Sequence, residues 1–140
     1  MLGLAAAYGG LAQFCAGMWE YKRNNTFGAT AFTSYGAFWM SFALLLTFYA
    51  AKIPAAALPA ALGFYLLSWA IFTAYMTVAA VHVSRPVLAV FVLLTITFLV
   101  LAAGAFESNA AVSMIGGYFG IATAIAAWYA SALGVYAARL

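Results

Sequence analysis

Hydrophobic residues run along this chain in five long stretches separated by short polar connections. The stretches cover approximately residues 2–19, 32–51, 58–80, 86–105 and 110–136. A helix needs about 20 apolar residues to cross a hydrocarbon core about 30 Å thick, so each stretch meets or approaches the length of a membrane span. The short connections force neighbouring helices to run antiparallel. The pattern predicts an all-α fold, a polytopic transmembrane helix bundle forming a single domain over residues 1–140.

The composition places the chain in a lipid bilayer. Hydrophobic residues make up 69% of it and charged residues only 5%, whereas about a quarter of the residues in a soluble domain are charged. The net charge is +3, but the basic residues lie in separate loops, which argues against a nucleic-acid partner. Cys15 is the only cysteine, so the chain has no internal disulfide and no multi-cysteine metal site.

The basic residues also predict an orientation in the membrane. Four of them fall on one side of the predicted bundle: Lys22, Arg23, Arg85 and Arg139. The positive-inside rule places the loop at residues 21–25 and the C-terminus in the cytoplasm, with Lys52 and Glu107 outside. Met1 is then outside as well. An even number of spans with both ends inside would be simpler, which predicts that one N-terminal helix is missing.

The densest polar cluster lies in residues 17–39, here called the signature segment, which reads GMWEYKRNNTFGATAFTSYGAFW. Asn25 or Thr26 is a good N-cap for the second helix, and the N-terminus of a helix attracts anions. With Lys22 and Arg23 adjacent, this spot favours a carboxylate or a phosphate. The simpler interpretation, in which the cap only ends a helix and the basic pair only sets topology, is at least as well supported.

Glu20 and Gln13 are the polar residues of the first span. An ion pair with its basic neighbours is the simpler explanation of Glu20, and a carboxylate that gates protons or substrate is the alternative. Gln13 lies seven residues earlier and hence on nearly the same helical face. Its amide needs a partner inside the bilayer, which points it into the bundle or into a water-filled path.

Two further patterns concern hydroxyls and small residues. Thr30, Ser34 and Ser41 form one polar stripe on the second span and are candidates for lining a pore. Other threonines are expected to bond their own helix backbone, as in Thr47, Thr73, Thr77, Thr95 and Thr97. A row of small residues in the last span allows close helix contact, either within the bundle or between subunits. Its members are Gly116, Gly120 and Ala124.

Enzyme chemistry has no constellation to support it. No acid or base lies near the middle of a span, and His82 stands at a loop boundary without a carboxylate or cysteine cluster. No phosphate loop, nucleotide fingerprint or metal spacing occurs. We therefore expect no enzymatic activity, no cofactor and no bound metal.

The signature segment resembles that of the acetate uptake transporter family, the succinate–acetate permeases of bacteria, archaea and fungi. Supporting matches are YGGLAQ at residues 8–13, GGYFG at residues 116–120 and AWY at residues 127–129. The resemblance implies a homo-hexamer in the plasma membrane or an inner membrane, with six helices per subunit. Each subunit would pass acetate and related short mono- and dicarboxylates such as succinate.

The resemblance also implies roles for particular residues. The family's hydrophobic constriction combines an aromatic residue of its first helix with a tyrosine and a leucine, which match Tyr35 and, by alignment through Arg85, Leu94. Gln13 and Glu20 match the family's glutamine and glutamate, and its Asn-Thr-Phe-Gly motif, at the cytoplasmic mouth, matches Asn25, Thr26, Phe27 and Gly28.

The family's first helix, which begins with Asn-Pro-Ala-Pro-Leu-Gly-Leu, has no counterpart in this sequence. We therefore expect either a truncated sequence, which is the favoured explanation, or a shortened form. The leading hypothesis for function is a carboxylate channel or permease in the bilayer. The alternative is a non-transporting membrane subunit, or a sensor related to acetate or ammonium.

Overall fold

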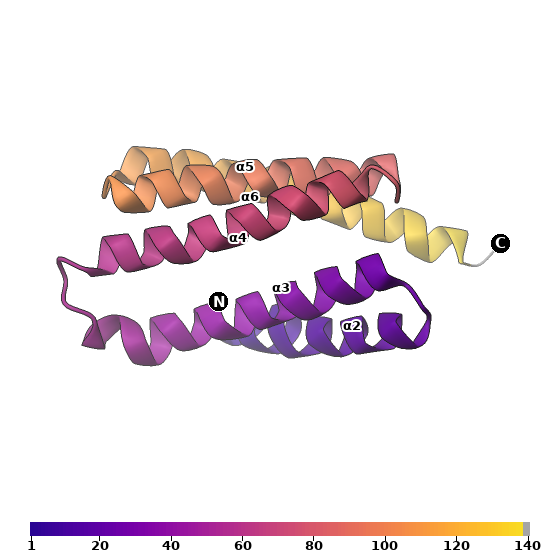
Figure 1. Cartoon of the computed structure of the whole chain (residues 1–140), viewed down its shortest axis with the longest axis horizontal. Coiled ribbons are helices and arrows are strands. Elements are labelled where there is room, and N and C mark those ends of the chain that lie inside the picture. Colours follow the sequence, from indigo (N-terminus) through magenta and orange to yellow (C-terminus); the bar gives the residue numbers. More distant parts are fainter. Residues whose placement is uncertain (139–140) are drawn as a thin grey trace. The chain divides into compact units, whose positions relative to one another are not determined.

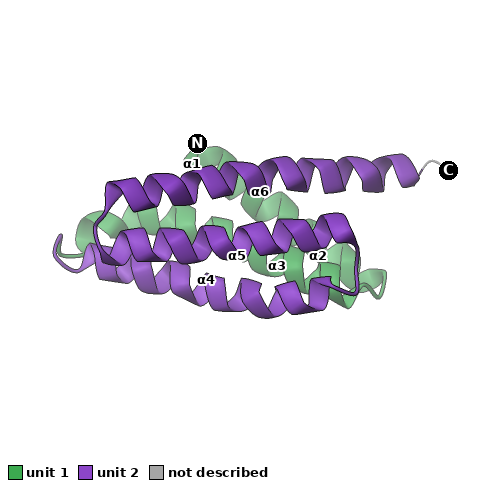
Figure 2. Cartoon of the chain, turned by 90° about the horizontal axis from the view of Figure 1, so that it is seen from above, with its two compact units in different colours: residues 1–54 green, residues 55–140 purple. Residues whose placement is uncertain are grey.

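The computed structural model describes residues 1–138, which form helices joined by short turns (Figure 1). Contacts divide the chain into two compact units, Met1–Pro54 and Ala55–Leu140 (Figure 2). No strand occurs among the described residues. The all-α fold class is confirmed, whereas the single domain over residues 1–140 stays a prediction.

The first unit contains two helical segments joined by a turn at residues 23–25. The first segment comprises α1 (Leu2–Leu4), the π-helical η1 (Ala5–Ala12) and α2 (Gln13–Lys22). The second comprises α3 (Thr26–Leu44), the π-helical η2 (Leu45–Tyr49) and the 3₁₀-helical η3 (Ala50–Lys52). Because Asn25 caps its N-terminus, the second segment begins at Thr26, before the apolar stretch that starts at residue 32.

Glycines bring α2 and α3 together. A Cβ atom on Gly17 would lie 2.6 Å from the backbone nitrogen of Thr33, and one on Gly36 would lie 2.6 Å from that of Phe14. Such distances leave no room for any side chain, so the two backbones meet directly, as small residues allow in membrane helices.

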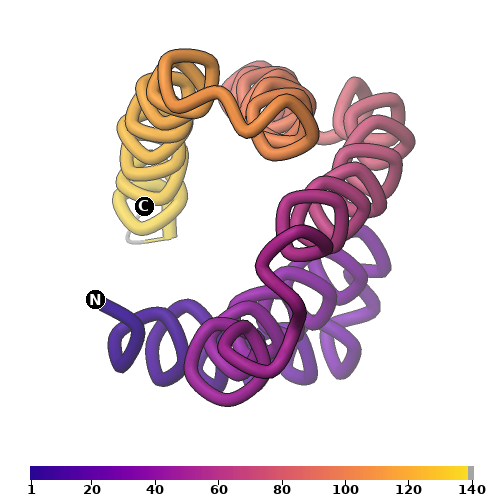
Figure 3. Tube along the Cα trace, turned by 90° about the vertical axis from the view of Figure 1, so that its left-hand side faces the viewer, coloured from indigo at the N-terminus to yellow at the C-terminus, as the bar shows by residue number. Residues whose placement is uncertain are grey.

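The second unit contains three helices, α4 (Leu58–Ala80), α5 (Arg85–Phe106) and α6 (Ala110–Ala137). Proline stands in the first turn of both α4 and α5, where its missing N–H costs nothing. Ser84 and Asn109 cap α5 and α6 with side-chain oxygens. Because the connecting turns are short, α5 packs antiparallel against both neighbours and lies between them (Figure 3).

Within residues 1–138, four helical segments are long and apolar enough to cross a membrane: Thr26–Lys52, Leu58–Ala80, Arg85–Phe106 and Ala110–Ala137. The segment at residues 2–22 is helical but is not among these four. It carries Gln13 and the glycine pair Gly9 and Gly10, which lower its mean hydropathy. The first of the five predicted spans therefore stays a prediction.

Candidate functional site

One asparagine side chain stabilises the turn between α2 and α3 by both accepting and donating a hydrogen bond. Asn25 Oδ1 accepts a hydrogen bond from the backbone nitrogen of Gly28 at 3.1 Å. Asn25 Nδ2 donates to Glu20 Oε2 at 2.6 Å. The carboxylate therefore keeps the amide oxygen directed at the helix N-terminus, where an acceptor is needed. Of the two caps that the sequence offers, the structure selects Asn25, and Thr26 is the first residue of α3.

The charged groups at this turn are arranged around Glu20. Arg23 Nη1 lies 3.9 Å from Glu20 Oε1, and the side chain of Arg23 is 71% exposed against 18% for Glu20. Lys22 Nζ lies 5.0 Å from the centre of the Trp19 ring. The ion pair expected as the simpler explanation of Glu20 is present. Because Arg23 is largely exposed, the pair contributes little to stability, and both cations stay open to solvent.

The hydroxyl stripe of α3 is not uniform. Ser41 donates to the carbonyl of Phe38 at 3.0 Å, so it is satisfied by its own helix. Within residues 1–138 the hydroxyls of Thr30 and Ser34 make no hydrogen bond, and neither does the half-buried amide of Gln13. In a bilayer such groups need water or a polar ligand.

The two constriction residues belong to different units. Tyr35 is buried, with 8% of its surface exposed, on α3 of the first unit. Leu94 is half-buried on α5 of the second unit. Phe27 is half-buried in the first turn of α3. The constriction that would unite Tyr35 with Leu94 stays a prediction.

The small residues of α6 do not share one environment. Gly116 is buried, and a Cβ atom there would lie 2.7 Å from Leu101 Cδ2 on α5. Gly120 is half-buried, with the nearest approach 3.6 Å to Thr97 Cγ2, and Ala124 is exposed. The first two therefore serve packing within the unit. Arg139, which supports the predicted cytoplasmic C-terminus, lies outside the described residues.

The threonines of the second unit make contacts that the sequence did not reveal. As expected, the hydroxyls of Thr73, Thr77, Thr95 and Thr97 each lie within hydrogen-bond distance, 2.7 or 2.8 Å, of the carbonyl four residues earlier. Thr77 also lies 2.9 Å from Thr95, hydroxyl to hydroxyl, and Thr97 lies 3.2 Å from Thr123. The sequence held one indication of these contacts: Thr95 and Thr97 stand two residues apart on one helix and therefore point to different sides of it.

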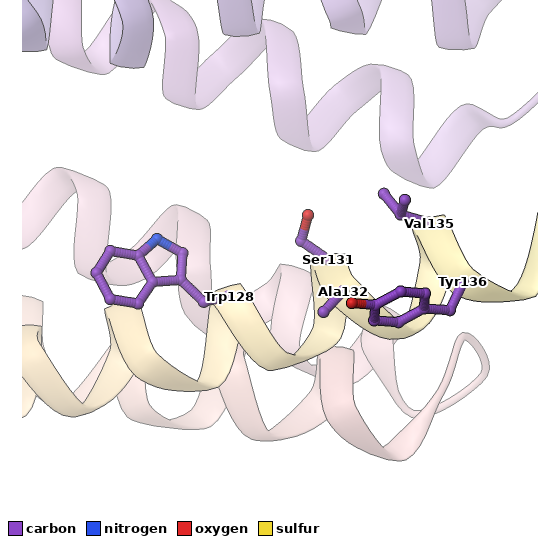
Figure 4. Close-up of a pocket in the computed structure, with 5 residues that line it drawn as sticks. All are labelled: Trp128, Ser131, Ala132, Val135 and Tyr136. Atoms are coloured by element: carbon purple, nitrogen blue, oxygen red, sulfur yellow. The ribbon is translucent and has the colours of Figure 1, made fainter.

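One open hollow lies along the C-terminal part of α6 (Figure 4). Its lining comes from this single helix: Trp128, Ser131, Ala132, Val135 and Tyr136. None of these side chains carries a charge, so the hollow offers a carboxylate no ionic partner. Among residues 1–138 no three His, Cys, Asp or Glu side chains gather into a metal site.

Comparisons with known proteins agree with this architecture. Residues 1–139 match the model of the GPR1/FUN34/yaaH family. "Accumulation of dyads protein 2" of Saccharomyces cerevisiae is 43% identical over 140 residues, which are 96% of this chain and 50% of the yeast protein. The "Succinate-acetate/proton symporter SatP" of Escherichia coli K12 is 39% identical over 129 residues, which are 92% of this chain and 69% of that protein.

A solved structure is also similar. It is described as "Structure of the bacterial acetate channel SatP" and superposes with a TM-score of 0.92 at 37% identity, covering 99% of this chain and 77% of the other. The chain spans about half the length of the yeast relative that it matches. With its apolar helices and these similarities, the chain is a multi-pass membrane protein, and it belongs to the GPR1/FUN34/yaaH family.

Proposed function

We propose that this protein is a membrane channel or permease for acetate and related short carboxylates, including succinate. The observation that carries the proposal is the TM-score of 0.92, at 37% identity, to a protein described as an acetate channel. The match extends over 99% of the chain. The name of the Escherichia coli relative, a succinate-acetate/proton symporter, supports the same substrate class.

The chemistry of the α2–α3 turn suits an anion. Lys22 and Arg23 are exposed, and the single carboxylate nearby, on Glu20, is bonded to Asn25 and paired with Arg23. Excess positive charge raises the local concentration of anions. In the proposal this turn is the cytoplasmic mouth, and the homo-hexamer places one mouth in each subunit.

The polar groups of the first unit give the anion partners in transit. Gln13, Thr30 and Ser34 have hydrogen-bonding capacity that no described residue uses. A small carboxylate that sheds part of its hydration needs such donors. Tyr35 and Leu94 then form the hydrophobic constriction, which limits the size of the carboxylate that passes.

Reconstitution into liposomes that contain a pH-sensitive dye tests the proposal. An acetate gradient should change the internal pH faster than in protein-free liposomes. Acetate that crosses the membrane either brings a proton with it or shifts the acid–base equilibrium of acetic acid inside. A rate equal to that of protein-free liposomes would favour the alternative of a non-transporting membrane subunit.

Replacing Tyr35 by alanine tests the constriction in the same assay. Because Tyr35 is buried and is the proposed narrowing, Tyr35→Ala should change the ratio of butyrate flux to acetate flux in favour of butyrate. Tyr118→Ala is the control, since Tyr118 on α6 is 63% exposed and is no part of the proposed path. Equal flux ratios in the two variants would remove Tyr35 from the path.

A further inference from the structure

Helix α5 is joined to each of its neighbours by a pair of threonine hydroxyls. Thr77 on α4 and Thr95 on α5 have their oxygens 2.9 Å apart, a pair we call the α4 clamp. Thr97 on α5 and Thr123 on α6 have theirs 3.2 Å apart, the α6 clamp. Figure 3 shows α5 between the two helices that the clamps reach. Each hydroxyl has a single proton, so within a pair one hydroxyl donates to its partner instead of to the carbonyl of its own helix. Hydrogen bonds of this kind and close packing hold membrane helices together, because lipid gives them no hydrophobic driving force.

In the α4 clamp, the Thr77 hydroxyl contacts one turn of α5 at two atoms. Thr77 Oγ1 also lies 3.2 Å from the carbonyl oxygen of Phe91, which accepts from Thr95 Oγ1 at 2.8 Å. The two α5 atoms that the Thr77 hydroxyl contacts therefore belong to residues 91 and 95, the first and last residues of a single helical turn. Rotation of this turn about the helix axis would break both contacts.

Leu94 lies on that turn, between the two clamps. At about 100° per residue, Thr95 stands about 100° from Leu94 around the axis and Thr97 about 60° on the other side. A rotation of α5 by about 20° would move the Leu94 Cα atom, on a cylinder of radius about 2.3 Å, by about 0.8 Å. Such a rotation moves the hydroxyls of Thr95 and Thr97 sideways, away from their partners on α4 and α6.

We propose that Thr95 and Thr97, with their partners Thr77 and Thr123, are positioning residues that fix Leu94 and thereby determine the largest carboxylate that passes. The inference rests on the proposed function, in which Leu94 forms part of the constriction. The threonines need not touch the substrate. They act through the rotational position of α5, and a loosened clamp widens the range of positions that Leu94 samples.

The test compares two kinds of double variant, reconstituted as the complete chain in liposomes with a pH-sensitive dye. Valine keeps the shape of threonine and removes the hydroxyl, so the first kind is Thr77→Val with Thr95→Val, and Thr97→Val with Thr123→Val. Serine keeps the hydroxyl, and the second kind carries serine at the same positions. Sodium acetate and sodium butyrate are the probes, and the readout is the ratio of their fluxes.

The valine variants should raise the butyrate-to-acetate ratio severalfold, and the serine variants should keep the ratio of the unmodified protein. Ser68→Ala is the control, because the Ser68 hydroxyl donates at 2.8 Å to the Phe64 carbonyl of its own helix. Its ratio should not change. Thermal unfolding of every variant is measured alongside, and valine variants that lose stability without a change in ratio would overturn the inference.

Leu94→Ala separates this inference from the proposed function. If Leu94→Ala leaves the ratio unchanged, the proposed constriction is wrong and the clamps lose their role with it. If Leu94→Ala raises the ratio and the valine variants do not, only the clamp inference is wrong. When both raise it, adding the valine pairs to Leu94→Ala should give no further increase, since interacting residues are not additive.

Discussion

Asn24 and Ser108 adopt the same left-handed backbone conformation in two different turns. Their φ angles are 57° and 50°, in the left-handed region, although neither is glycine. Each is followed by an asparagine N-cap, and the backbone nitrogens of Asn25 and Asn109 donate to the carbonyls of Glu20 at 3.0 Å and Gly104 at 2.9 Å. These bonds span six residues, as in a Schellman end of a helix. The α2–α3 and α5–α6 turns are therefore built alike.

Glycine should stabilise the second of these turns. The left-handed conformation costs an ordinary residue about 1–2 kcal/mol, and asparagine adopts it more readily than serine. Ser108→Gly is expected to raise the free energy of unfolding in detergent by about 1 kcal/mol, and Asn24→Gly by less. Thermal unfolding followed by circular dichroism gives the comparison.

Ser131→Gly provides the control for this prediction, because Ser131 lies inside α6 and its replacement should lower the stability by about 0.5 kcal/mol. A Ser108→Gly variant that unfolds at a lower temperature than the unmodified protein would contradict the strain assigned to this turn.

The sequence predicted an N-cap for α3 but not the hydrogen-bond partner of the capping side chain. Asn25 and Thr26 were both acceptable N-caps, because each precedes an apolar helix. The choice of Asn25 follows from its amide, which accepts from Gly28 while donating to Glu20. That second bond depends on the chain turning back at Asn24, and residue spacing alone does not reveal such a turn.

Among the elements, α6 shows where sequence patterns stop being informative. Spacing of four residues picked out Gly116, Gly120 and Ala124 as a packing row. Only Gly116 is buried, and Ala124 is exposed. Which side of α6 meets α5 is decided by how the α5–α6 turn orients the helices, and small residues occur on more than one side. The threonine pairs were hidden for the same reason, since their meeting depends on helix register and rotation.

The adjacent glycines of α6 give a matched test of this packing. A Cβ at Gly116 would lie 3.1 Å from the Leu101 backbone nitrogen, whereas a Cβ at Gly117 would have nothing within 4 Å. Gly116→Ala should lower the free energy of unfolding by about 1–3 kcal/mol, as overpacking does. Gly117→Ala should raise it by up to about 1 kcal/mol through helix propensity. Similar effects in the two variants, measured by thermal unfolding, would argue against the α5–α6 contact.

For the whole molecule, the membrane class and the family followed from the sequence, because 69% hydrophobic residues and the signature segment leave few alternatives. The number of spans stays a prediction. Five stretches were predicted, and four helices have the length and composition to cross a bilayer. The segment at residues 2–22 differs because glycines and Gln13 interrupt its apolar run.

Orientation in the membrane is a property of the whole molecule that labelling can test. In a Cys15→Ala background, single cysteines at Asn24 and Glu107 occupy exposed positions in two turns. The positive-inside rule predicts that a membrane-impermeant maleimide added to intact cells labels Glu107→Cys at once. Asn24→Cys should react only after the cells are permeabilised. Labelling in the opposite order would place Lys22 and Arg23 outside the cell.

The length of α6 has a consequence for the lipid around the protein. Its 28 residues extend about 42 Å, against a hydrocarbon core of about 30 Å. Figure 2 shows its C-terminal part running past the turn between α4 and α5. Such a helix adapts to its surroundings by tilting or by thickening the nearby bilayer. The length of the lipid acyl chains should therefore affect this protein through hydrophobic mismatch at α6, the helix that packs against α5 in its unit.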